Sequence, residues 1–153
     1  MTRILEQRLQ INAPARIVYA LLTEAAGLLE WMGVEAETEQ RPGGRIWWRH
    51  ANGDACSGQF LELMPHSRVV FTYGWEREDV GIAPGSTLVE IDLAEQEGVT
   101  TVTLLHKGLS EPARLAHTHG WAHYLGRLAA RAEGGDVTPD PLAGSRVPSF
   151  RER

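Results

Sequence analysis

The sequence predicts an α+β domain in which a curved, seven-stranded antiparallel sheet wraps around one long C-terminal helix. Residues 3–12 alternate like a strand and precede two short helical segments. Residues 34–107 contain six more strand-like runs, and residues 111–132 have helical periodicity. Because short turns join most of these runs, the strands are expected to pair as antiparallel neighbours and the sheet to pack against the last helix.

The N-terminal part is expected to be one strand followed by two short helices. Residues 3–12 alternate between apolar and polar side chains, which is typical of a half-buried strand. Pro14 suits the first turn of a helix over residues 15–22. Thr23 is placed to N-cap a second helix that extends to about Met32. Both helices are too short to be stable alone, so they are expected to pack against a larger element.

The middle of the chain is expected to supply the rest of the sheet. The predicted strands cover residues 34–39, 45–50, 55–64, 68–76, 87–93 and 100–107. Turn sequences such as RPGG and ANGD separate them and contain the glycines that hairpins need at positive φ. These runs complete the seven strands.

The C-terminal part is expected to be a long helix and a tail. Ser110 can N-cap the helix, which should end near Gly134. We expect residues 1–133 to form a single domain. Residues 134–153 are rich in Pro, Gly and Ser and are expected to be a tail without a core of its own.

Charge and composition exclude several classes of function. The net charge of −5 and the lack of a basic cluster argue against nucleic acid and anionic membranes as partners. No apolar run is long enough for a signal peptide or for membrane insertion. The single cysteine, Cys56, cannot form an internal disulfide and fits a reducing, cytoplasmic location. No nucleophile elbow or phosphate-binding glycine loop is present, so no cofactor is expected and any catalytic residue is unknown.

Six blocks of sequence resemble a known family. In order they read PARIVYALLTEAAGLLEWM, RPGGRIWW, GQFLELMPHSRVVFTYGWE, STLVEIDL, TTVTLLHKGL and HGWAHYLGRL. Together, over roughly residues 5–130, they resemble the activator of heat-shock protein 90 ATPase homologue family of the START-like (SRPBCC, polyketide cyclase-like) superfamily. The resemblance implies the helix-grip fold and an internal cavity for a hydrophobic ligand. It implies no fixed reaction, because the superfamily contains lipid carriers, cyclases, hormone receptors and co-chaperones.

The stretch HTHGWAHYLGRL, residues 117–128, holds three of the six histidines. At about 100° per residue, His117 lies on the apolar stripe with Trp121, whereas His119 and His123 lie on the opposite side. The three therefore cannot converge on one metal. His119 and His123 are spaced i, i+4, but no HExxH glutamate or third ligand accompanies them, so we expect no metal site and two solvated side chains. Gly120, which is costly inside a helix, is expected to let a neighbouring element approach.

Strand alternation places many aromatic side chains and two histidines on the inner face of the sheet. A mostly apolar pocket with a few polar groups is typical of a small-molecule site. The residues expected to line this cavity are Trp31, Trp48, His50, Phe71, Tyr73, Trp75, His106, His117, Trp121 and Tyr124.

Two interpretations remain open for the histidines and for Glu62. His106 and His117 are either core side chains bonded to a backbone carbonyl or a tyrosine, or groups that orient a ligand or exchange protons. Glu62 lies between two leucines, so it is either exposed or a buried base with a raised pKa. The favoured function is binding of a small hydrophobic or aromatic molecule. The alternatives are a cyclase- or dehydratase-like enzyme that uses a cavity histidine, and a co-chaperone-like protein-interaction module in the stress response.

One tryptophan is expected to face outward. Trp47 and Trp48 are adjacent in a predicted strand, so one of the pair must leave the inner face. An outward Trp47 flanked by Arg45 and Arg49 would suit an interface, which indicates a possible homodimer. The eukaryotic co-chaperone has an extra N-terminal domain that contacts its chaperone, and nothing precedes residue 5 that could match it, which disfavours that role.

Overall fold

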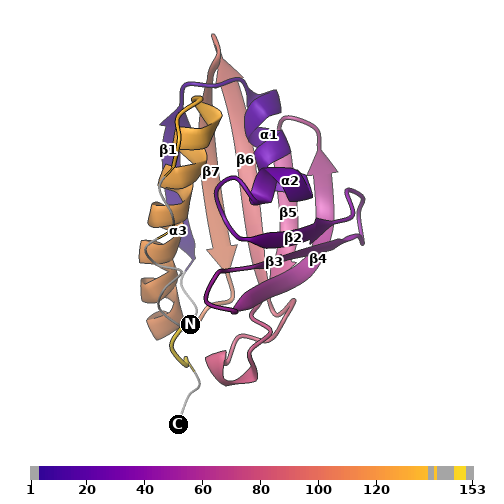
Figure 1. Cartoon of the computed structure of the whole chain (residues 1–153), viewed down its shortest axis with the longest axis vertical. Helices are drawn as coiled ribbons and strands as arrows, with labels where there is room; N and C mark the ends of the chain where they lie inside the picture. Colours follow the sequence, from indigo (N-terminus) through magenta and orange to yellow (C-terminus); the bar gives the residue numbers. More distant parts are fainter. Residues whose placement is uncertain (1–3, 138–139, 141–146, 151–153) are drawn as a thin grey trace.

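A computed structural model describes residues 4–137, 140 and 147–150, and it confirms the α+β fold with a seven-stranded antiparallel sheet (Figure 1). The elements are β1 (Leu5–Ile11), α1 (Ala15–Thr23), α2 (Ala25–Leu28), β2 (Glu35–Thr38), β3 (Arg45–Arg49), β4 (Ala55–Met64), β5 (Arg68–Tyr73), the 3₁₀ turn η1 (Glu78–Val80), β6 (Thr87–Gln96), β7 (Val99–Lys107) and α3 (Glu111–Ala132). None of the helices in the described ranges is long and apolar enough to cross a membrane.

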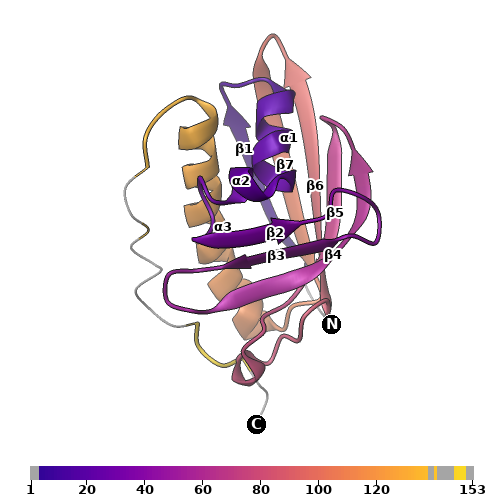
Figure 2. The same ribbon diagram turned by 45° about the vertical axis from the view of Figure 1, so that its right-hand side comes forward.

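The strand order is β1-β7-β6-β5-β4-β3-β2. Strands β2 to β6 each pair with the next strand in the sequence, and β1 completes the order by pairing with β7, from Leu5 opposite His106 to Ile11 opposite Thr100. The first and second strands therefore lie at opposite edges, and α1 and α2 cross the sheet between them. Figure 2 shows β2 and β3 crossing the front of the molecule, with α3 behind their ends.

The sheet bends within β4 (Figure 2). The first half of this strand pairs with β3 and the second half with β5, and its register shifts between Phe60 and Glu62. At Gly58 the strand passes so close to its neighbour that a Cβ would stand 1.8 Å from the carbonyl oxygen of Thr72. Glycine is therefore required there, and the bend turns β2 and β3 toward α3.

The core lies between the inner face of the sheet and the helices. Val102, Leu104 and His106 of β7 are all buried, as the alternation predicts. Helix α3 turns Trp121 and Leu128 toward them, so the predicted helical phase is correct. At about 25 cal/mol per Å² of apolar surface removed from water, this packing is the main stabilising contribution to the fold.

Three local predictions were wrong. Thr23 does not cap the second helix, because it is the last residue of α1 and donates its hydroxyl to the carbonyl of Tyr19 at 2.8 Å. Glu24 is the N-cap instead, and α2 is a single turn. Strand β5 ends at Tyr73 rather than residue 76, and Trp75 makes only an isolated bridge with Cys56.

The predicted tail lies partly outside the described residues, which exclude 138–139, 141–146 and 151–153. Residues 147–150, called the C-terminal segment below, pack against the domain. The amide of Phe150 donates to the carbonyl of Val80 at 2.7 Å, and Val147 is packed against the core cluster. This part of the chain therefore contributes to the domain surface beside α3.

Candidate ligand cavity

A cavity of about 290 Å³ lies between the inner face of the sheet, helix α3 and the C-terminal segment. Its lining comprises Met32, Trp48, His50, Asn52, Tyr73, Trp75, Ala116, His117, His119, Gly120, Trp121, Tyr124, Val147, Pro148 and Phe150. The side chains at the sheet end, such as Trp48 and Tyr73, are buried, whereas His119 and Pro148 are exposed. The cavity therefore has a closed inner end and an open end beside the C-terminal segment.

Seven of the ten residues expected around a cavity line this one: Trp48, His50, Tyr73, Trp75, His117, Trp121 and Tyr124. The other three lie in the surrounding core. Trp31 donates its indole N–H to the carbonyl of Leu21 at 2.8 Å, and Phe71 packs edge-on against Trp48. His106 is completely buried and accepts a hydrogen bond from Trp121, which separates it from the cavity. The alternation of β7 predicts that His106 faces inward, but it cannot predict that Trp121 covers it.

Three tryptophan–histidine pairs surround the cavity. In each pair the indole N–H donates to a ring nitrogen of the histidine. The pairs are Trp48 with His50 Nε2 at 3.2 Å, Trp75 with His117 Nε2 at 3.2 Å, and Trp121 with His106 Nδ1 at 3.0 Å. Because an indole N–H can only donate, each accepting nitrogen must be unprotonated. The geometry therefore holds all three histidines in their neutral forms.

Burial acts in the same direction as these hydrogen bonds. It lowers the pKa of His50 and of His117, against smaller opposing effects from Asp140 and from the Ala113 carbonyl respectively. Burial, together with the nearby His117, lowers the pKa of His106 to about 3. Charging any of these three rings would cost both desolvation and a hydrogen bond, so His50, His106 and His117 are uncharged at neutral pH.

The remaining ring nitrogens also have partners. His117 donates from Nδ1 to the carbonyl of Ala113 at 2.8 Å, and its Nε2 lies 3.1 Å from the Tyr73 hydroxyl. His106 Nε2 lies 2.9 Å from Thr87 Oγ1, and His50 Nδ1 lies 3.2 Å from the Tyr124 hydroxyl. The contacts of His106 and His117 therefore agree with the first interpretation, in which both are core side chains that are hydrogen-bonded to neighbouring groups.

A chain of polar contacts leads from the cavity to residue 140. The hydroxyl of Tyr124 donates to one carboxylate oxygen of Asp140, and His123 Nε2 lies 2.7 Å from the other. His123 is therefore partly buried and paired, which corrects the expectation that it is solvated. His119 is exposed as expected, yet it lines the open end of the cavity.

Sequence reasoning missed eight lining residues: Met32, Asn52, Ala116, His119, Gly120, Val147, Pro148 and Phe150. The helical phase could have indicated Gly120, which lies near the edge of the apolar stripe, but it placed Ala116 on the opposite side of the helix. No comparable signal exists for the C-terminal segment, whose composition has no periodicity. Gly120 was expected to admit a neighbouring element, but a Cβ there would meet no atom within 4 Å.

Asp54 and Arg77 hold the C-terminal segment in place. The carboxylate of Asp54 is fully buried and accepts two hydrogen bonds from Arg77 Nη1, at 3.0 and 2.9 Å. The same carboxylate accepts the amide of Val147 at 3.0 Å, while Arg77 Nη2 donates to the Val147 carbonyl. Both polar backbone groups of Val147 are thus bound by one ion pair. The ring of Phe150 then lies 5.8 Å from that of His117.

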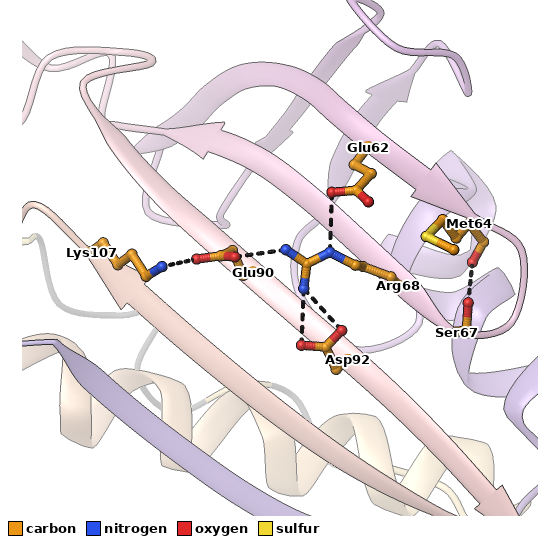
Figure 3. A network of polar contacts seen from close by, with 7 residues as sticks. All are labelled: Glu62, Met64, Ser67, Arg68, Glu90, Asp92 and Lys107. Atoms are coloured by element: carbon orange, nitrogen blue, oxygen red, sulfur yellow. Dashed lines mark hydrogen bonds and ion pairs between the residues drawn. The ribbon is translucent and has the colours of Figure 1, made fainter.

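Glu62 lies on the outer face of the sheet, away from the cavity. Its carboxylate accepts from Arg68 Nε at 3.1 Å, and Arg68 also contacts Asp92 and Glu90 (Figure 3). These acidic partners raise the pKa of Arg68. The bulge after Phe60 explains this position, because it reverses the inward–outward alternation of β4 at this point. The sequence alone had left the direction of Glu62 open. Glu62 is not a buried base.

Metal and thiol chemistry find little support in the described ranges. There, no group of three or more His, Cys, Asp or Glu side chains is placed to hold a metal ion. The thiol of Cys56 is buried, and burial raises its pKa well above the ordinary value. A thiol in this state is a poor nucleophile.

A curved antiparallel sheet around a long C-terminal helix, with a cavity between them, defines a protein of the START-like, helix-grip class. A family model described as "Activator of Hsp90 ATPase homolog 1-like protein" matches residues 12–133. The chain belongs to this family.

Solved structures agree with this assignment. The AHSA1-like protein RHE_CH02687 from Rhizobium etli is 38% identical, with 100% of this chain and 96% of that chain covered and a TM-score of 0.70. The Aha1 dimer from Colwellia psychrerythraea is 23% identical, with 88% and 99% covered and a TM-score of 0.75. DynU16, a putative protein in the dynemicin biosynthetic locus, is 21% identical with a TM-score of 0.74; the match covers 87% of this chain but 48% of DynU16. No protein with a curated description matches the chain.

Proposed function

We propose that this protein binds one small, uncharged aromatic or hydrophobic molecule in the cavity between the sheet and α3. The observation that carries the proposal is that the indole donors around the cavity already have hydrogen-bond partners within the protein. The indole N–H groups of Trp48 and Trp75 are bonded to histidines of the cavity wall, and that of Trp121 is bonded to His106 in the core behind it. A bound molecule would therefore meet ring faces and edges at the inner end, where burying a charge without a partner is costly.

The size and charge of the cavity support this choice of ligand. Its volume of about 290 Å³ is close to the lower end of ligand pockets, which begin at about 300 Å³. None of the described lining residues is Lys, Arg, Asp or Glu. A one- or two-ring molecule with a single polar group suits such a space, and that group could lie near Asn52 and His119 at the open end.

A binding experiment with a matched pair of variants tests the proposal. Isothermal titration calorimetry with 1-naphthol is expected to show saturable one-to-one binding to the wild type. Ala116→Phe, which fills the cavity from α3, is expected to abolish binding. Ala122→Phe, on the exposed face of the same helix, should leave it unchanged. Native mass spectrometry of freshly purified protein should also reveal a mass that denaturation removes. An empty protein that takes up no 1-naphthol would refute the proposal.

The enzymatic alternative has less support. A general base needs a ring nitrogen free to take a proton, and the six ring nitrogens of His50, His106 and His117 all have partners. The protein-interaction alternative rests on the family name alone, which assigns no partner to this chain.

A further inference from the structure

Gly120 interrupts α3 at the place where the helix borders the cavity. It lies nine residues after Glu111, well inside the helix. Glycine is a poor helix former because its backbone loses the most conformational freedom on folding. A glycine at such a position is usually explained by a neighbour that leaves no room for a side chain.

No such neighbour exists within the described ranges. A Cβ built on Gly120 meets no heavy atom within 4 Å outside its own stretch of helix. The space beside it is the cavity, of which Gly120 forms part of the wall between His117 and Tyr124. The absence of a side chain therefore enlarges the cavity and exposes the helix backbone to whatever occupies it.

We propose that Gly120 determines the size of the molecule that the cavity accepts, by letting a ligand ring pack directly against the backbone of α3. This inference rests on the proposed function. It assigns the second ring of a two-ring ligand to the space beside Gly120, and a single-ring ligand does not need that space. A side chain at position 120 would therefore discriminate between the two sizes.

Gly126 provides a matched control in the same helix. A Cβ at Gly126 also meets nothing within 4 Å. Gly126 is exposed and is not a lining residue, because it lies about 180° around the helix from His117. A substitution at either glycine improves helix propensity alike, but only a substitution at Gly120 takes volume from the cavity.

The test compares phenol and 1-naphthol as probes by calorimetry. Gly120→Leu and Gly126→Leu are each expected to raise the Tm by about 3 °C, which verifies that both variants fold. Gly120→Leu should weaken 1-naphthol binding at least about tenfold and phenol binding less than about threefold, since a single methylene in an apolar pocket changes affinity by about tenfold or more. Gly126→Leu should leave both dissociation constants within about twofold of the wild type.

Each contrary result has a distinct meaning. A wild type that binds neither probe refutes the proposed function, and the role of Gly120 with it. A wild type that binds both probes, with Gly120→Leu indistinguishable from Gly126→Leu, refutes the role of Gly120 alone. Equal weakening of phenol and 1-naphthol by Gly120→Leu would also refute it, because the position would then block the cavity rather than select by size.

Discussion

The tryptophan–histidine pairs are the residue-scale feature that decides the character of the cavity. Alternation predicted that His50 and His106 would face inward, and helical phase predicted the same for His117. The pairing itself could not be predicted, because Trp75 and His117 are 42 residues apart and meet only through the packing of α3 on the sheet. Side-chain faces follow from local periodicity, whereas partners across the core follow from register and packing.

Stability is expected to fall as the pH falls from about 6.5 toward 3. The folded-state pKa of His106 is about 3, below its unfolded value near 6.5, so the unfolded chain binds more protons in that interval. The stabilising contribution is complete above pH 6.5. Between pH 7 and pH 5 His106 alone should cost about 2 kcal/mol in the free energy of unfolding. His50 and His117, whose pKa values are also lowered, should add to the loss.

Urea denaturation at the two pH values measures this loss. His106→Gln should reduce the pH dependence while lowering the stability at pH 7, whereas the exposed His119→Gln should leave the stability at pH 7 unchanged. A His106→Gln protein with the same pH dependence as the wild type would contradict the assignment.

Trp121→Phe isolates one indole hydrogen bond. Phenylalanine keeps an aromatic ring but removes the N–H that His106 Nδ1 accepts, so a buried acceptor loses its donor. The expected loss is about 1–3 kcal/mol in the free energy of unfolding, from chemical denaturation. Trp47→Phe, outside the cavity, should change stability by less than about 0.5 kcal/mol. Equal effects of the two substitutions would show that the Trp121 hydrogen bond contributes little.

Among the elements, the regular ones were the most predictable. Strand β7 and helix α3 were predicted almost to the residue because each keeps one periodicity throughout its length. The bounds of strand β4 were also predicted correctly, but the direction of Glu62 was not, because the bulge after Phe60 reverses the alternation and moves Glu62 outward. The C-terminal segment follows no periodicity, and its place depends on a buried carboxylate 93 residues earlier.

Arg77→Ala is expected to release the C-terminal segment. It removes the cation that pairs with the buried Asp54 and the donor to the Val147 carbonyl. Losing one partner of a buried ion pair costs about 3 kcal/mol or more. Hydrogen exchange should show faster exchange at the amides of Val147 and Phe150. Arg41→Ala, which removes an exposed ion pair with Glu39, is the control and should change neither the stability nor the exchange of these two amides. Unchanged protection in Arg77→Ala would mean that other contacts hold the segment.

For the whole molecule, the order of elements was enough to predict the architecture. A strand, two short helices, six strands joined mostly by short turns and a long helix can bury their apolar faces together only if the sheet curves around that helix. The cavity could be predicted in outline, since the inner-face aromatics were identified. Its extent could not, because volume depends on the bend of β4, on Gly120 and on the C-terminal segment.

The molecule is also expected to form a homodimer through the outer face around Trp47. This tryptophan is only half-buried, with the Arg45 guanidinium 5.4 Å from its ring centroid. Light scattering coupled to size exclusion should give twice the chain mass of 16.9 kDa, and Trp47→Glu should give the single-chain mass. A wild type of single-chain mass at high concentration would contradict the prediction.

The position of the C-terminal segment bears on how the protein is handled at the bench. Chain ends are where affinity tags are attached and where trimming is done before crystallisation, since most domains tolerate both. Here trimming that removes residues 147–150 acts on the cavity itself, because Val147, Pro148 and Phe150 form part of its wall. Affinities measured on protein that lacks residues 147–150 would describe a cavity with a different wall.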